Sequence, residues 1–116
     1  MRITYEQLDG IRPALSKLSK LDLKATEAVK LARLVAKAES ELKLFEDTKI
    51  SLFKKYGEEE NGGFRVKDEN REAFFKEYRE LCNTDINLDV ETFSITSEIS
   101  IDAASVLALE GFVNFE

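Results

Sequence analysis

The sequence predicts a mainly α-helical fold with a small β element, an α+β fold in which an elongated antiparallel helical hairpin is built on one long central helix. Three observations indicate it. Neither Gly nor Pro occurs from Ala14 to Tyr56, apolar residues recur at helical spacing on both sides of a Gly-containing loop, and the segment after Asn83 changes to an alternating apolar pattern. With 116 residues, the chain is expected to fold as one domain spanning 1–116.

The first predicted helix covers about residues 5–20. Thr4 followed three residues later by Gln7 is a capping-box pattern, which is typical of a helix start. Pro13 lacks the amide hydrogen that a helix interior uses, so we expect a bend at this position. The apolar residues that share one face of this helix are Leu8, Ile11, Leu15 and Leu18.

The longest predicted helix covers residues 24–56, and Gly57 ends it. Its length of about 50 Å is large beside the radius of gyration of about 13 Å that a compact domain of this size has, so we expect an elongated fold or a covering partner. Lys49 is the one polar residue in its apolar seam. The seam positions are spaced alternately three and four apart: Ala28, Leu31, Val35, Ala38, Leu42, Phe45, Lys49, Leu52 and Tyr56.

A third helix is predicted over residues 69–82, with Asp68 or Asn70 as its N-cap. The first and third helices together would be about as long as the central one. We therefore expect the first helix to pack on the N-terminal half of the central helix and the third on its C-terminal half. Apolar side chains occupy one broad face of the third helix: Phe74, Phe75, Tyr78, Leu81 and Cys82.

The C-terminal tail predicts a strand over about residues 86–95, with a slip in the alternation between Val90 and Phe93. Ser100 is expected to cap a short helix over about 101–109, which Gly111 ends. Strands need hydrogen-bonded neighbours, so we expect at most a small sheet or ribbon. The candidate partner strands are Arg2–Thr4, Phe64–Val66 and Phe112–Phe115.

The loop at residues 57–68 has two interpretations. Five acids, Asn61 and the Gly62-Gly63 pair within "YGEEENGGFRVKDEN" approximate a calcium-binding EF-hand loop, but placing either Gly62 or Gly63 at the sixth position leaves one ligand position without a ligand. The simpler interpretation is a turn, in which Asn61-Gly62 supplies positive φ angles and a short strand follows. We favour the turn and expect no bound metal.

The composition leaves few routes to catalysis. Histidine is absent, which removes the commonest general base, the commonest zinc ligand and the Ser-His and Cys-His nucleophile pairs. Cys82, the one cysteine, lies beside Leu81 on the apolar side of the third helix, with Glu80 and Asp85 nearby in sequence and no histidine to activate it, so we expect a buried structural thiol. Asp89 and Glu91 could be drawn as an acid/base pair, but the solvent side of an amphipathic strand explains them equally. We expect a protein that is not an enzyme and has no cofactor.

Charge divides the chain into two unequal halves. Residues 1–56 carry 12 Lys or Arg and 8 Asp or Glu, whereas residues 57–116 carry 5 and 15. The acidic half argues against binding to a phosphate backbone and suits a basic protein partner, so no nucleic acid is expected. The first residues lack the apolar run of a signal peptide and no stretch is long enough for a membrane span, so we expect a cytoplasmic protein that does not bind membranes.

Six residues are candidates for contact with a partner. Lys49 either fixes register against a partner's acid or extends its amine past the edge of an interface. Three acids of the tail would meet a basic surface, and two aromatic residues would contribute apolar area. The complete set is Lys49, Asp85, Asp89, Glu91, Phe112 and Phe115.

Four stretches are informative when taken together: "MRITYEQLDGIRPALSKLSKLDL", "FEDTKISLFKKYGE", "VKDENREAFFKEYRELCNTDINLDVETFSI" and "ISIDAASVLALEGFV". In this order they resemble a family of small uncharacterised proteins, a domain of unknown function, encoded by tailed phages and prophages. The resemblance spans nearly the full length. It implies a phage origin and expression in the cytoplasm of the bacterial host. The family has no established activity, so the resemblance implies no functional residues.

These observations lead to three hypotheses about function. The first is a non-enzymatic phage protein that binds another protein during virion or tail assembly or as an infection accessory, with possible self-association along the central helix left open. The second is an acidic inhibitor of a host anti-phage defence or of a nucleic-acid-binding protein. The third, a small-molecule or metal-dependent enzyme, ranks lowest because histidine and a phosphate-binding loop are both missing.

Overall fold

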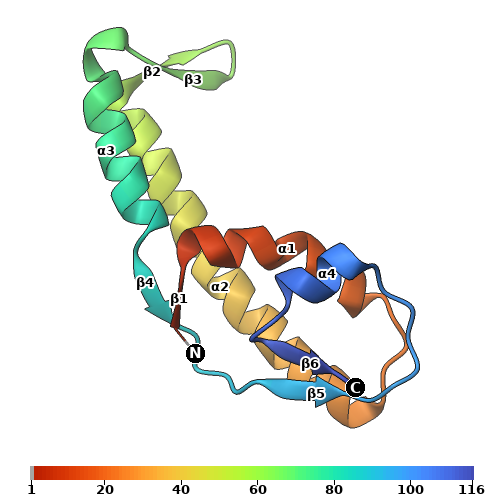
Figure 1. The fold of residues 1–116 in the computed structure, drawn as a ribbon. Coiled ribbons are helices and arrows are strands. Elements are labelled where there is room, and N and C mark those ends of the chain that lie inside the picture. Colours follow the sequence, from red (N-terminus) through yellow and green to blue (C-terminus); the bar gives the residue numbers. More distant parts are fainter. Residues whose placement is uncertain (1) are drawn as a thin grey trace.

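A computed structural model describes residues 2–116 and shows an elongated molecule (Figure 1). Its principal extents are 53 × 28 × 22 Å and its radius of gyration is 17.3 Å, well above the roughly 13 Å of a compact chain of this length. The expected α+β architecture on one long central helix is confirmed. At one end lies a body built from the N- and C-terminal parts of the chain, and from it projects a two-helix arm, residues 46–82.

The four α-helices lie close to their predicted ranges: α1 (Tyr5–Ser19), α2 (Ala25–Tyr56), α3 (Arg71–Cys82) and α4 (Ala103–Ala108). The capping box at the start of α1 is confirmed. Thr4 Oγ1 accepts a hydrogen bond from the Gln7 amide at 3.2 Å, and the Thr4 amide donates to Gln7 Oε1 at 2.9 Å. At Pro13, where we expected a bend, α1 continues as one helical element.

One predicted cap was wrong, and another is right in position but makes no capping bond. Asp102, not Ser100, caps α4, because its Oδ2 accepts the Ser105 amide hydrogen at 3.1 Å and the helix therefore begins only at Ala103. Asn70 stands at the N-cap position of α3 but makes no capping bond there. A short 3₁₀ helix, η1 (Asp68–Asn70), precedes α3 instead.

Within residues 2–116, six short strands form three separate two-stranded sheets. β1 (Arg2–Thr4) pairs antiparallel with β4 (Asp85–Asn87), β2 (Gly57–Glu60) antiparallel with β3 (Gly63–Val66), and β5 (Phe93–Ile95) parallel with β6 (Val113–Phe115). Two of the three candidate partners of the tail, Arg2–Thr4 and Phe112–Phe115, were thus predicted correctly, whereas Phe64–Val66 pairs with β2 instead of the tail. The single strand predicted over 86–95 was wrong, because the slip after Val90 separates β4 from β5 and each pairs with a different terminal segment.

The body holds the hydrophobic core. It is built from α1, the first two thirds of α2 and the tail, and its largest fully buried side chains are Leu8, Leu18, Leu34, Leu42, Leu88, Ile95 and Leu109. The expected packing of α1 along the N-terminal half of α2 was only partly right. Tyr5 at the start of α1 stacks on Phe45 at 5.2 Å, in the middle of α2, and the tail elements lie beside both helices beyond that crossing (Figure 1).

The arm is the C-terminal part of α2 with β2, β3, η1 and α3, and here the expected packing of the third helix on α2 is confirmed (Figure 1). Aromatic rings hold it together: the Phe74 ring centroid lies 5.0 Å from that of Phe53 and 6.4 Å from that of Tyr56. Among residues 46–82, Phe74 is the only buried side chain. The arm therefore has an aromatic seam instead of a sealed core.

Candidate interaction surfaces

The end of the arm is a β-hairpin, which confirms that the acidic loop is a turn. Asn61 has φ of 50° and Gly62 has φ of 81°, so these two residues form the tight connection between β2 and β3. The hairpin starts earlier than predicted because α2 runs directly into β2 at Gly57. A Cβ there would lie 2.7 Å from the Phe53 carbonyl oxygen and 2.9 Å from that of Arg65, so only glycine fits.

The two faces of the hairpin carry different kinds of side chain. Phe64 is paired with Glu59 and shares its face, and the Phe64 ring lies 6.2 Å from Phe53, yet 40% of its surface stays exposed. An ion pair of 2.9 Å joins Lys67 to Glu58, and the hydrogen bond that Lys67 Nζ donates to that carboxylate raises the pKa of Lys67. Among residues 2–116, no three acidic or cysteine side chains cluster as a metal site would require.

Polar contacts fasten α3 to the end of α2. Asn70 Nδ2 donates to the carbonyl oxygen of Tyr56 at 3.2 Å, so the predicted N-cap residue of one helix instead satisfies the last carbonyl of another. Lys55 Nζ lies 3.3 Å from Glu77, and hydrogen bonds to Tyr56 and then to Glu77 raise the Lys55 pKa. Lys49 is half-buried, with its amine 5.9 Å from the centre of the Tyr78 ring, which is an internal contact.

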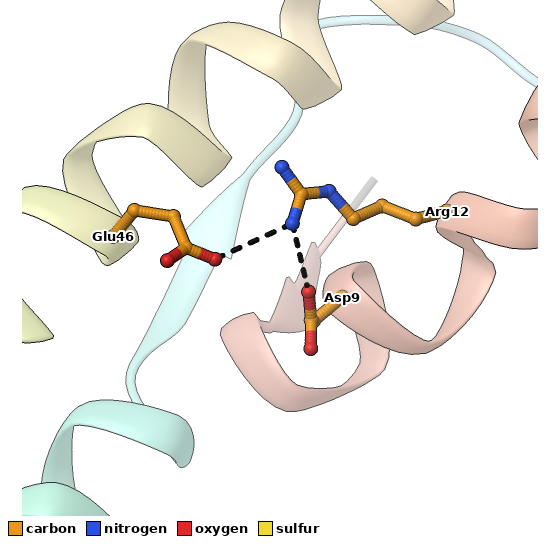
Figure 2. A network of polar contacts seen from close by, with 3 residues as sticks. All are labelled: Asp9, Arg12 and Glu46. Atoms are coloured by element: carbon orange, nitrogen blue, oxygen red, sulfur yellow. Dashed lines mark hydrogen bonds and ion pairs between the residues drawn. The ribbon is translucent and has the colours of Figure 1, made fainter.

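A polar network braces the junction between body and arm (Figure 2). Arg12 Nη1 on α1 lies 3.3 Å from Asp9 Oδ1 and 3.3 Å from Glu46 Oε1 on α2. Tyr78 of α3 has a raised pKa. Burial of the hydroxyl is the largest cause, a hydrogen bond with Cys82 comes second, and the negative charges of Asp9 and Glu46 also raise it. Three helices thus meet at this point.

A buried carboxylate attaches the tail to the start of α2. Glu27 is only 6% exposed and accepts hydrogen bonds from both the amides and the hydroxyls of Thr96 and Ser97, including one of 2.8 Å from the Thr96 amide. These bonds, the Ser97 hydroxyl first, lower the Glu27 pKa to about 2. The sequence offered no signal for this contact, since Glu27 reads as an ordinary acid in the first turn of a helix.

The acidic tail lies against basic parts of the same chain. Lys17 Nζ is 3.2 Å from Asp102, and Lys30 and Arg33 of α2 line a groove together with Asp89 and Glu91. Asp102 is the only tail acid among the ion pairs of the described residues. The acids predicted to contact a partner, Asp85, Asp89 and Glu91, are all exposed.

The remaining predicted residues lie elsewhere. Residues 88–92 form no strand, so the strand face that Asp89 and Glu91 were expected to share does not exist. Phe112 is buried in the body core and Phe115 is half-buried against it, so neither offers a free apolar surface. Cys82 is a free thiol and half-buried, where a buried one was expected.

No helix within residues 2–116 combines the length and the apolar character that crossing a bilayer requires. None of the large apolar side chains exposed within residues 2–116 is among the six predicted contact residues: they are Val29, Leu44, Ile50, Phe64, Phe75 and Leu107. Phe75 was expected on the apolar face of the third helix and is instead 47% exposed. Aromatic residues are favoured in protein interfaces, which makes Phe64 and Phe75 of the arm the most informative of these. Comparison with known proteins gave no match to a family model, to a curated protein or to a solved structure.

Proposed function

We propose that this chain is a phage-encoded, non-enzymatic protein that binds a protein partner through the hairpin end of its arm. The observation that carries the proposal is the incomplete burial of the aromatic seam at that end: Phe64 stacks on Phe53 yet is 40% exposed. An aromatic ring held in place by a neighbour loses little conformational freedom on binding, which is why such residues often dominate binding energy.

The shape of the molecule supports the same proposal. The arm projects from a body that is sealed by its own tail, so its end is free to enter a recess on a partner (Figure 1). Exposed Glu59 shares the hairpin face of Phe64, and the exposed acids Glu58 and Glu60 flank it along β2, so the hairpin end favours a partner with basic residues around an apolar pocket. The resemblance to phage and prophage proteins supports a partner in the bacterial host cytoplasm or in the virion.

Affinity purification from infected cells tests the proposal. The wild-type chain should capture one phage or host protein reproducibly, whereas Phe64→Asp should lose it. Glu59→Lys should weaken capture, because it reverses a charge on the hairpin face that carries Phe64 while leaving the ring contact in place. The matched control is Leu107→Asp, which places the same charge on a body residue that is 70% exposed.

The proposal fails if no phage or host protein is captured from cells or particles, or if the Leu107 control loses the partner as fully as the Phe64 variant. Circular dichroism of each variant establishes that the helices are intact. A partner that is lost only in the arm variants would assign binding to the hairpin end.

A second candidate function uses the tail. It is inhibition of a host anti-phage defence protein, or of another nucleic-acid-binding protein, through acids that imitate a phosphate backbone. The favouring observation is that Asp85, Asp89 and Glu91 are exposed and none forms an ion pair within residues 2–116. Expression of the chain alone should then protect phage from defence, and the triple reversal to Lys should abolish protection while Phe64→Asp does not.

A further inference from the structure

The face of α3 that points away from α2 carries a short, ordered stripe. Glu72, Phe75 and Arg79 follow one another at spacings of three and four residues, so they lie in line along the helix. All three are exposed, and Phe75 is 47% exposed in the middle of a charged surface. Its ring is held edge-on by buried Phe74 at 5.5 Å. The ring is therefore fixed in position although half of it meets solvent.

The stripe is complementary to itself. If a second α3 lies antiparallel on the first about a two-fold axis beside Phe75, each Phe75 faces its own copy. Each Glu72 then faces the Arg79 of the other chain, and the two contacts are equivalent by symmetry. The spacings of three and four residues differ by one residue, so the two members of each pair are out of line by about 1.5 Å along the helix axis, which long side chains absorb.

The two charged residues of the stripe have no ion-pair partner within residues 2–116. Glu72 and Arg79 form no ion pair there, whereas the neighbouring Arg71 is already paired with Asp68 at 2.8 Å. An acidic or basic partner would complement one end of the stripe and oppose the other. A second copy in antiparallel orientation complements both ends and covers the aromatic ring between them.

We propose that this protein forms a symmetric dimer through the Glu72–Phe75–Arg79 stripe of α3. The stripe spans about two turns of helix, so the dimer is a weak one, in the class of interfaces below roughly 1,200 Å². It leaves the hairpin end of both arms uncovered. This inference is independent of the proposed partner binding, which uses Phe64.

The test uses two charge-reversed variants. Copies of the same variant should repel each other across the dimer contact, whereas one variant should attract the other. Sedimentation velocity of the wild-type chain should show a concentration-dependent monomer–dimer equilibrium that weakens with salt. Glu72→Arg alone places Arg against Arg79, and Arg79→Glu alone places Glu against Glu72, so each should dimerise about tenfold more weakly or worse. An equimolar mixture of the two variants should restore association, because both contacts become Arg with Glu.

The mixture keeps the result independent of folding defects, since a misfolded variant cannot recover on mixing. Lys37→Glu, an equal charge change on an exposed α2 residue, should leave the wild-type equilibrium unchanged. A wild-type chain that stays monomeric at every concentration, a mixture that stays monomeric, or a control as weak as the reversals would each overturn the dimer. Variants that are monomeric yet still capture the partner would separate this inference from the proposed function.

Discussion

The body and the arm use different means to stay folded. The body buries aliphatic side chains from both ends of the chain in one core, and every large side chain that is fully buried belongs to it. The arm buries Phe74 alone and relies on ring contacts and on three exposed ion pairs, Lys55–Glu77, Lys67–Glu58 and Arg71–Asp68. Exposed pairs of this kind each contribute about 0.2–1 kcal/mol.

This difference between body and arm indicates which region has the greater conformational freedom. Local opening has its lowest free energy where few apolar contacts are buried, so the arm should open before the body does. The arm is also where aromatic surface stays exposed. The same scarcity of burial that weakens the arm leaves side chains available for contact with other molecules. Five predictions test this contrast.

Phe74→Ala should have the largest effect and confine it to the arm. Removing a buried phenylalanine costs about 4 kcal/mol, and no other buried side chain in residues 46–82 compensates. Hydrogen exchange should show α3 and the hairpin losing protection while α1 and the tail keep theirs. Equal loss of protection in α1 would show that body and arm fold as one unit.

Leu8→Ala should cost about 3 kcal/mol but act on the whole molecule, since Leu8 is fully buried in the core. Urea denaturation should show a lower midpoint for the entire far-ultraviolet signal. If the arm retained its protection after the body had unfolded, the dependence of the arm on the body would be contradicted.

Gly57→Ala should cost about 2 kcal/mol, because the new methyl group would overlap two backbone oxygens and displace the hairpin from α2. The measurement is exchange of the β2 and β3 amides. Gly10→Ala provides the control: it meets nothing within 4 Å, and the gain in helix propensity should stabilise α1 by about 0.5–1 kcal/mol. Equal effects of both substitutions would argue against the steric explanation.

Lowering the pH into the acid range should weaken the attachment of the tail to α1 and α2, whereas pH changes near neutrality should leave it unchanged. Hydrogen bonding lowers the pKa of Glu27 from 4.5 to about 2 and that of Asp102 from 3.8 to about 2. Each folded carboxylate holds its proton less tightly than the unfolded one, so its stabilisation is complete above about pH 4.5 and is lost as the pH falls toward about 2. The Thr96 and Ser97 amides should lose protection over this interval, before those of α3.

Glu27→Gln should remove most of this pH dependence and weaken attachment of the tail at neutral pH, because an amide cannot accept all of the hydrogen bonds that the carboxylate accepts. Amide protection in β5, compared between the variant and the wild type across pH, provides the measurement. An unchanged acid response in the variant would assign the effect to other carboxylates.

The helices were predictable because their signals are local. The long run without Gly or Pro placed α2 within one residue of its observed bounds, and the capping box placed the start of α1. The heptad seam holds best from Leu42 onward, where first α1 and then α3 cover α2. Closer to the N-terminus the tail covers α2, so Ala28 is exposed and Leu34, outside the predicted seam, is buried.

The long-range contacts could not be predicted in the same way. The alternation at 86–95 indicated extended chain correctly, but β4 and β5 are separated by their partners, β1 and β6, which come from opposite ends of the sequence. Glu27 and Thr96 are likewise 69 residues apart. Of the candidate interaction residues, the tail acids are exposed as expected, whereas Phe112 was an apolar residue whose burial depended on tertiary packing.

The parallel pairing of β5 with β6 also orders events during synthesis. Completion of the body core requires Leu109 and Val113, and the Glu116 amide donates to the Ile95 carbonyl at 3.0 Å. The contacts of the arm join residues within 46–82, and contacts between near neighbours in sequence form faster than distant ones. The contacts within the arm can therefore form while translation continues, although the arm becomes stable only once the body core is complete. Until residues 109–115 emerge from the ribosome, the apolar faces of α1 and α2 stay exposed to solvent, and chaperones can bind them during this interval.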